Sequence, residues 1–131
     1  MKWTVFILLV LTSACSFKRL AVNQVGDALA AGGTTFSADD DPDLIKAAAP
    51  FSLKLMESLL AENPNHKGLL LATTSGFTQY GYAFVQPEAD ELETRDLAGA
   101  TALRDRARKL YLRARNYGLR GLGLRFGPCR N

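Results

Sequence analysis

The sequence predicts an all-α fold of about four helices, arranged as antiparallel helical hairpins behind an N-terminal signal peptide. In four segments, apolar residues recur at intervals of three and four, which is the spacing of one face of an α-helix. Glycine, proline and asparagine interrupt the spacing between these segments, and no segment shows the convincing alternation of a half-buried strand. Helices joined by short loops become antiparallel neighbours, so two stacked hairpins are expected.

The first fourteen residues have the layout of a bacterial signal peptide. Lys2 supplies a charge, an apolar run covers residues 5–11, and small residues follow it directly before Cys15. The apolar run is far shorter than the ~20 residues that a helix needs to cross a bilayer, so it does not anchor the protein. We therefore divide the chain into a signal peptide, 1–14, and a helical-repeat domain, 15–131.

Residues 11–15, Leu-Thr-Ser-Ala-Cys, resemble the lipobox of bacterial lipoproteins. The resemblance implies that the Cys15 thiol is acylated and that the chain is cut just before it, which leaves a lipid-anchored protein. Each buried methylene of an acyl chain contributes ~0.8 kcal/mol, so several chains hold a protein firmly to a membrane. Ser16 stands where an aspartate would resemble an inner-membrane retention signal, and this favours the outer membrane. Secretion without lipid is the alternative.

Local signals set the boundaries of the first two helices. We predict four helices, over residues 17–31, 42–62, 67–87 and 95–117. The first ends at Gly32, because glycine tolerates the left-handed conformation found after a helix. Asp41 can cap the second helix, and Pro42 suits its first turn, where no amide hydrogen is required. Pro50 lies inside that helix and is expected to kink or split it.

The boundaries of the last two helices depend on weaker signals. Asn65 follows the Asn-Pro interruption and can cap the third helix. An acidic joint, residues 88–93, leads into the fourth helix. Beyond that helix, Gly118, Gly121 and Gly123 should weaken any continuation.

Positive charge gathers in the C-terminal part of a chain whose formal net charge is +3. Between Arg104 and Arg130, nine basic residues accompany a single acid, Asp105. A basic helix of this kind can bind nucleic acid or anionic lipid. The export signal argues against nucleic acid as a partner, and apolar residues interleave with the arginines at helical spacing. We interpret most of these arginines as the solvated face of an amphipathic helix.

The chain displays no catalytic or metal-binding constellation, so we predict a protein that is not an enzyme and needs no cofactor. Its one histidine, His66, lies in a polar loop, where a capping or solvated role is expected and general-base catalysis is not. The acidic residues 39–43 lack the glycine and the distal glutamate of a calcium loop, and helix capping explains them. Cys129 is interpreted as a residue without a metal or redox role.

Three aromatic residues of the third helix are the candidate binding residues. Phe77, Tyr80 and Phe84 are spaced by three and four positions and so share a face, while Tyr82 points elsewhere. A core role is the first interpretation, since helices pack through such stripes. The alternative is a groove between helix pairs that accepts an apolar ligand or a partner segment.

Several stretches of the chain resemble known families. Residues 59–66, followed by a helix with Gly76 and Tyr80, look like a junction between tetratricopeptide repeats, in which a proline ends one helix pair. Runs along nearly all of the mature chain resemble the T-component family of TRAP (tripartite ATP-independent periplasmic) transporters. These runs are residues 22–31, 51–60, 75–80, 82–85, 108–115 and 117–121.

That resemblance implies a helical-repeat lipoprotein on the periplasmic side of the envelope that accompanies a TRAP transporter. The implied partner is the P component, the soluble protein that captures the solute. Members of the family continue into further helix pairs, whereas this chain departs from them after about Gly121, so we expect a C-terminally truncated domain. Each repeat covers its neighbour's apolar face, so the fourth helix should be partly uncovered, which favours a homo-oligomer or aggregation.

Two other classes of function are weighed against this one. A general helical-repeat scaffold lipoprotein would assemble envelope proteins without any link to transport, and it would not bring down a P component. A small envelope hydrolase would need catalytic residues that the chain does not display.

Overall fold

The computed structural model describes residues 17, 20–32 and 38–126 of the 131-residue chain, without the side chains of residues 124–126. Its helices are an unlabelled one over residues 20–31, α3 (Pro42–Glu62), α4 (Lys67–Tyr80), the π-helix η1 (Gly81–Val85), α5 (Gln86–Leu92) and α6 (Leu97–Phe126). No strand occurs in the described ranges, and the predicted all-α class is confirmed. The predicted signal peptide, Cys15 and Cys129 lie outside the described residues.

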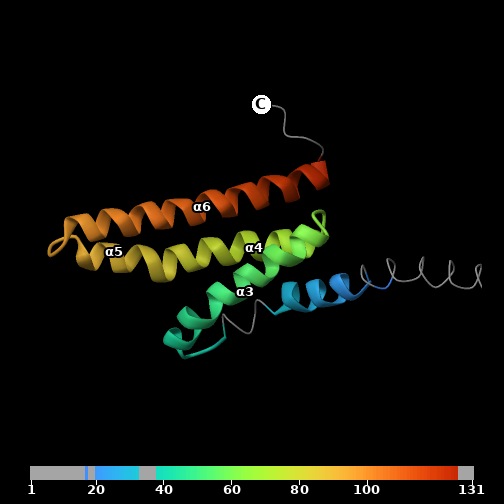
Figure 1. Ribbon diagram of the computed structural model, residues 1–131, viewed down its shortest axis with the longest axis horizontal. Coiled ribbons are helices and arrows are strands. Elements are labelled where there is room, and N and C mark those ends of the chain that lie inside the picture. Colours follow the sequence, from blue (N-terminus) through green and yellow to red (C-terminus); the bar gives the residue numbers. More distant parts are fainter. Residues whose placement is uncertain (1–16, 18–19, 33–37, 127–131) are drawn as a thin grey trace, which may run out of the picture.

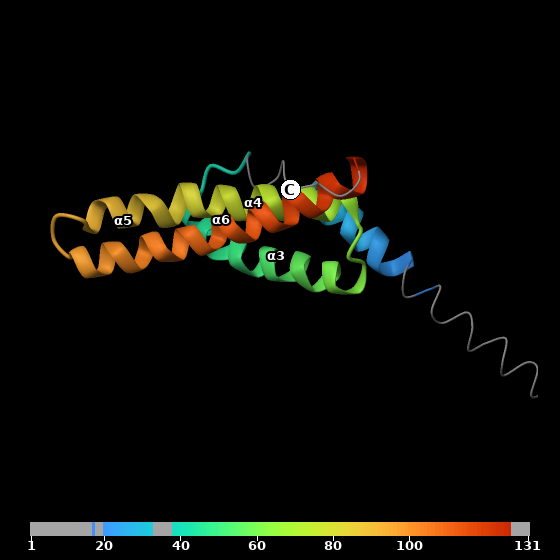
Figure 2. The same ribbon diagram turned by 90° about the horizontal axis from the view of Figure 1, so that it is seen from above.

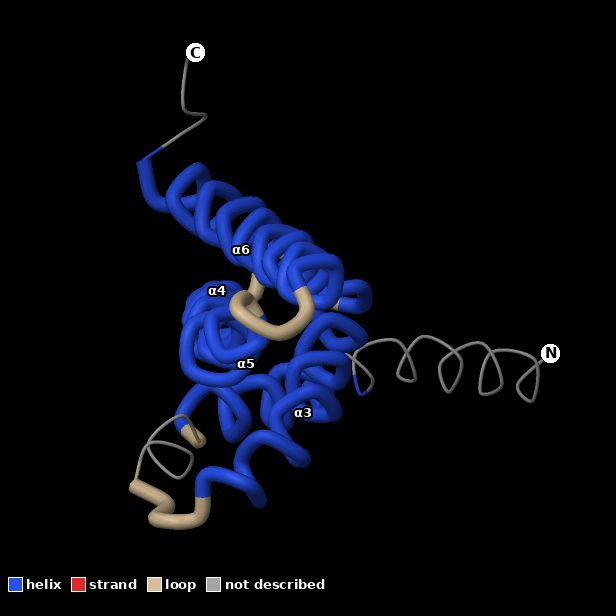
Figure 3. The backbone as a smooth tube through the Cα atoms, turned by 90° about the vertical axis from the view of Figure 1, so that its left-hand side faces the viewer, coloured by secondary structure: helices blue, strands red, loops and turns tan. Residues whose placement is uncertain are grey.

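The central helix is α4, which packs against α3 and against α6. η1 and α5 extend α4 into one long rod, and α6 runs back along that rod in the opposite direction (Figure 1; Figure 2). Seen along the bundle, α3 and α6 lie on different sides of the rod (Figure 3). The N-terminal half of α3 reaches α5, where Lys46 Nζ lies 3.4 Å from Glu88 Oε2. The two outer helices therefore share the rod as their common surface.

The core follows the rod from end to end. Leu69 and Leu70 at the start of α4 are 0% and 1% exposed, and Val85 in η1 is 1% exposed. Burying a side chain of this kind contributes about 1.5–3 kcal/mol. The core cluster consists of Leu53, Met56, Leu60, Leu69, Leu70, Phe77, Tyr80, Val85, Ala107 and Ala114. The small alanines on α6 let its backbone approach the rod closely.

The helix over residues 20–31 packs on the turn between α3 and α4. Asn63 Nδ2 donates a hydrogen bond to Asn23 Oδ1 at 2.7 Å. Gly26 is buried, and a Cβ atom there would lie 2.9 Å from His66 Nε2, so the close approach depends on glycine. The Gly32 amide donates to Ala28 O at 3.0 Å in the last turn, so the predicted end of this helix is confirmed.

α3 begins as predicted but is not split. Asp41 Oδ1 accepts hydrogen bonds from the amides of Asp43 (3.1 Å) and Leu44 (3.0 Å), with Pro42 in the first turn. A kink or a split was expected at Pro50, and the split does not occur, because one continuous helix spans Pro42–Glu62. An internal proline costs ~3 kcal/mol. Three buried side chains in the second half of α3 offset that cost by holding the helix on α4, namely Leu53, Met56 and Leu60.

The cap of α4 is His66, so the prediction that Asn65 caps this helix is wrong. His66 Nδ1 accepts a hydrogen bond from the Leu69 amide at 3.2 Å, and His66 O accepts from the Leu70 amide at 3.0 Å. A cap lies two or three residues before the amide that it binds, and His66 lies three residues before Leu69. The expected capping role of His66 is confirmed.

The acidic joint predicted at residues 88–93 is mostly helical, because α5 covers Gln86–Leu92. Pro87 does not end the rod but stands in the first turn of α5, directly after η1. A proline lacks an amide hydrogen and its ring crowds the carbonyl four residues earlier. In the π-helix the Gln86 amide reaches back to Gly81 O, and this wider turn makes room for Pro87.

α6 is longer than predicted. It begins at Leu97, where the Gly99 amide donates to Asp96 Oδ1 at 2.9 Å, and it continues to Phe126. The helix runs through Gly118, Gly121 and Gly123, so the expected weakening of its continuation is wrong, and for Gly118 the structure gives a physical reason. A Cβ at Gly118 would lie 3.3 Å from Thr74 Cγ2, so this glycine lets α6 lie close to α4.

None of the helices in the described ranges combines the length and the hydropathy that a membrane span requires.

Candidate functional site

The three predicted aromatic residues line one side of the rod at its contact with α6. Phe77 and Tyr80 are 2% and 8% exposed, and Phe84 is half-buried. The Tyr80 and Phe84 rings meet at a centroid distance of 5.6 Å, and Phe77 stacks on Tyr117 of α6 at 6.2 Å. Tyr82 is exposed. Phe77 and Tyr80 thus belong to the packed core, and Phe84 lies at its edge.

A row of three arginines on α6 covers these rings. Arg106 lies 5.9 Å from the ring centroid of Tyr80, and Arg113 lies 5.7 Å from that of Phe77. Arg120 is 5.3 Å from the centroid of the Tyr117 ring. A cation over an aromatic face contributes about 0.5–1 kcal/mol at an exposed site. These arginines are therefore more than a solvated face, because each covers an aromatic ring.

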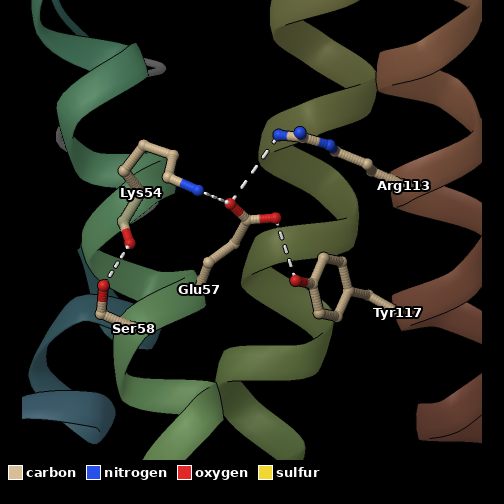
Figure 4. A network of polar contacts seen from close by, with 5 residues as sticks. All are labelled: Lys54, Glu57, Ser58, Arg113 and Tyr117. Carbon is tan, nitrogen blue, oxygen red and sulfur yellow. Dashed lines mark hydrogen bonds and ion pairs between the residues drawn. The ribbon is translucent and has the colours of Figure 1, made fainter.

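Glu57 joins α3 to α6 beside this row (Figure 4). Its Oε1 accepts a hydrogen bond from the Tyr117 hydroxyl at 2.9 Å. Its Oε2 lies 2.6 Å from Lys54 Nζ and 3.8 Å from Arg113 Nη1. Only 14% of the Glu57 side chain is exposed. One turn further along α3, Ser58 Oγ donates a hydrogen bond to the backbone oxygen of Lys54 at 3.0 Å. The carboxylate thus connects the two outer helices.

The surroundings hold Glu57 and Tyr117 in opposite protonation states. Burial raises the pKa of Glu57, but the hydrogen bonds of Lys54 and Tyr117 and the charges of Lys54 and Arg113 outweigh it, so its pKa lies below the ordinary 4.5. Burial, followed by the hydrogen bond to Glu57 and its charge, raises the pKa of Tyr117 above 10.0. A fixed donor therefore faces a fixed acceptor, and the pair suits positioning better than proton transfer.

This network was not predicted from the sequence. Lys54 and Glu57 are three residues apart on one helix, but Tyr117 is separated from Glu57 by 60 positions. One available signal was the spacing of seven between Arg106, Arg113 and Arg120, which places all three on one side of α6.

A shallow cleft of about 380 Å³ lies between α5 and α6. Arg108 and Arg115 line this cleft. They follow two arginines of the row, Arg106 and Arg113, by two residues each. Two residues correspond to a rotation of roughly 200° about the helix axis, so Arg108 and Arg115 lie on the other flank of α6. The wall also includes Gln86, Asp90, Arg104, Ala107, Tyr111 and Leu112. At one end Arg104 Nη2 pairs with Asp90 Oδ1 at 3.4 Å and with Glu93 Oε2 at 2.8 Å.

Tyr111, in the wall of this cleft, is held in place from two directions. Its hydroxyl donates a hydrogen bond to Gln86 Oε1 at 2.9 Å, and burial raises its pKa above 10.0. A Cβ at Gly81 would lie 3.2 Å from Tyr111 Cε1. The glycine at the start of the π-helix therefore lets the tyrosine lie against the rod.

The arrangement of the described residues suits binding. In these ranges no group of three or more His, Cys, Asp or Glu side chains could hold a metal ion. Both ring nitrogens of His66 have partners within the fold. Nδ1 accepts a hydrogen bond from the Leu69 amide, and Nε2 lies 3.3 Å from Asp27 Oδ1. What the described chain offers to other molecules is its helix surfaces, above all the two flanks of α6.

Comparisons with known proteins point to one family. The model of the TRAP transporter T-component family matches residues 38–126, which include α3 to α6. A protein of Treponema pallidum (strain Nichols), described as an uncharacterized protein, is 36% identical over 126 residues and the match covers 86% of this chain. The chain spans 39% of the length of that relative. No solved structure matches the chain.

Proposed function

The chain belongs to the TRAP transporter T-component family, and from this premise we propose that it is a non-enzymatic accessory component of a TRAP transporter system. Its task in this proposal is to bind the P component, the solute-capturing protein, through its helix surfaces. The observation that carries the proposal is the family match over residues 38–126. The described residues offer packed helices and charged flanks, which suit protein binding.

The proposal includes attachment to a membrane through Cys15. Its support is the lipobox-like segment at residues 11–15, which lies outside the described residues. Acylation there would place the protein on the periplasmic side of the envelope, with the outer membrane favoured by Ser16. Mass spectrometry of the protein purified from its cell membranes tests this point. We expect a chain that starts at a fatty-acylated Cys15, and a retained Met1 without lipid would contradict it.

Of the three aromatic residues predicted to line a ligand groove, only Phe84 is kept in the proposal as a residue that a ligand contacts directly. Phe77 and Tyr80 are buried under the arginine row, so a ligand could reach them only if α6 moved. Phe84 is half-buried and is the member of the set that a ligand can approach directly. In this form, Phe84→Ala weakens binding while helicity is kept, and Phe77→Ala lowers stability.

Co-purification tests the main proposal. The full-length protein is expressed in its own cells with a C-terminal tag, its complexes are isolated in mild detergent, and the proteins are identified by mass spectrometry. A P component is expected among them in amounts comparable to the tagged chain. Recovery of envelope proteins of other kinds, without a P component, would instead favour the general scaffold lipoprotein.

A further inference from the structure

The α5–α6 cleft carries positive charge that the fold does not use. Arg104 is neutralised by Asp90 and Glu93 at one end of the cleft. Arg108 and Arg115, in the middle and at the other end, form no ion pair with any carboxylate in the described part of the chain. Both are exposed. Two unpaired cations, one helical turn on either side of Leu112, therefore face outward from a hollow.

Apolar side chains continue this flank beyond the cleft. Leu112 is 36% exposed, and Leu119 and Leu122 are 46% and 48% exposed. Leu119 follows Leu112 by seven residues and Leu122 follows Arg115 by seven, so all four lie along one flank of α6. From Arg104 to Leu122 this flank is roughly 27 Å long at ~1.5 Å per residue, which matches a helix of about five turns.

We propose that this flank, formed by Arg104, Arg108, Leu112, Arg115, Leu119 and Leu122, docks an acidic amphipathic helix of a protein partner. The leucines of such a helix would pack between α5 and α6, and its carboxylates would pair with Arg108 and Arg115. A groove with apolar anchors at helical spacing and cations on its wall is the complement of an acidic amphipathic helix. The paired Asp90 and Glu93 set the orientation, because they repel acidic residues from the Arg104 end.

Two features favour a helix over an anionic membrane surface. The site is concave and is lined by Tyr111 and Leu112, so it meets a projecting ridge better than a flat layer of headgroups. The carboxylates of Asp90 and Glu93 also stand beside Arg104, so the free positive charge of this flank is confined to Arg108 and Arg115, a short span for a layer of headgroups. A membrane-binding helix would present its cations without acids beside them.

The proposal rests on the proposed function only in the identity of the partner. If the chain serves a TRAP transporter, the acidic helix belongs to the P component. The docking flank itself is tested independently, with a synthetic peptide as the probe.

The first experiment measures binding of the full-length protein to designed helical peptides by fluorescence anisotropy. One peptide carries leucines at every third and fourth position with glutamates beside them. A second carries lysines in place of the glutamates, and a third is the glutamate peptide with a proline at its centre. We expect the glutamate peptide to bind, the lysine peptide not to bind, and the proline peptide to bind at least about tenfold more weakly because its helix is broken. Rising salt should weaken the binding of the unaltered protein.

Charge reversals on neighbouring residues give matched variants. Arg108→Glu should weaken the glutamate peptide about tenfold, and Arg108→Glu with Arg115→Glu by about a hundredfold or more. Lys109→Glu is the control, because Lys109 is exposed, adjacent in sequence and turned away from the cleft. Leu112→Ser should also weaken binding, whereas Leu71→Ser, at an exposed leucine on α4, should not.

Equal binding of the glutamate and lysine peptides, or equal effects of Arg108→Glu and Lys109→Glu, would overturn the proposal. If the unaltered protein binds phosphatidylglycerol vesicles but no peptide, and the double variant no longer binds the vesicles, the flank binds a membrane and the proposal is wrong. If the unaltered protein is an oligomer in sedimentation and the double variant is a monomer, the flank binds a second copy of the chain and the proposal is also wrong. If the peptide binds at this flank but no P component does, only the proposed function fails. If the P component binds the double variant as well as the unaltered chain, the docking proposal fails and the proposed function stands.

Discussion

The Tyr117 hydroxyl on α6 donates a hydrogen bond to Glu57 Oε1 on α3, across 2.9 Å in space and 60 positions in sequence. Both helices pack mainly on α4, so this contact is a direct connection between the two outer members of the bundle. Tyr117 also stacks on Phe77 beneath it, and Arg113 lies over that ring while reaching Glu57. One tyrosine thus takes part in both the core and the polar connection.

Removing only the Tyr117 hydroxyl should separate these two roles. Tyr117→Phe keeps the stacking on Phe77 but leaves a charged acceptor without its donor, so the free energy of unfolding should fall by about 1.5 kcal/mol. Urea denaturation followed by circular dichroism measures it. Tyr82→Phe is the control, because Tyr82 is 70% exposed, and it should change stability by less than about 0.5 kcal/mol. Equal losses in the two variants would show that the hydroxyl contributes nothing.

The lowered pKa of Glu57 makes the free energy of unfolding decrease as the pH falls. Its pKa in the fold lies below the ordinary 4.5, so its contribution is fully present above pH 4.5 and is lost as the pH falls through the folded-state value. Glu57→Gln should therefore melt at a lower temperature than the unaltered chain at neutral pH, and the difference should shrink in acid. Thermal melts over a pH series measure this. Glu88→Gln, which removes an exposed ion pair with Lys46, should give a much smaller difference at neutral pH.

Gly76 and Gly123 offer a matched test of helix packing. A Cβ at Gly76 would lie 2.8 Å from Leu53 Cδ2 in the core, whereas nothing lies within 4 Å of one at Gly123. Gly76→Val should cost about 2 kcal/mol by overpacking the contact between α3 and α4. Gly123→Val should stay within about 0.5 kcal/mol of the unaltered chain, measured by urea denaturation. A Gly76 variant as stable as the Gly123 variant would mean that Leu53 moves aside without loss.

Because His66 caps α4, the loss caused by replacing it with alanine should be partly recovered by asparagine. His66→Ala leaves the Leu69 amide without its acceptor and should cost about 1 kcal/mol, together with faster hydrogen exchange at that amide. His66→Asn supplies a side-chain acceptor again and should recover part of both effects. Hydrogen exchange followed by NMR measures them. An asparagine variant no better than the alanine variant would assign the loss to packing against Gly26, not to capping.

Features that depend on neighbouring residues could be predicted from the sequence. Asp41 and Pro42 predict the start of α3 because a cap binds amides two and three positions away. The spacing of Phe77, Tyr80 and Phe84 likewise predicts that they share a face. In each case the interaction is local, so the residue types and their spacing contain the information.

Features that depend on distant contacts could not be predicted. Gly118 looks like a helix breaker in isolation, and only its contact with Thr74 explains why α6 continues through it. Pro87 looks like a helix end, and only the π-helix before it shows why the rod extends further. The partner of Glu57 was missed for the same reason, since a lone glutamate does not indicate which of many distant residues it will meet.

The π-helix η1 places one additional residue within the turn that joins α4 to α5. In a continuous α-helix each residue advances the side chains by about 100°, so that surplus residue rotates everything after it by the same angle. Gln86 and Asp90 face Tyr111 and Arg104 because of this rotation. Deleting a single residue between Gly81 and Val85 would thus leave the rod almost as long, while its far half presented a different set of side chains to α6.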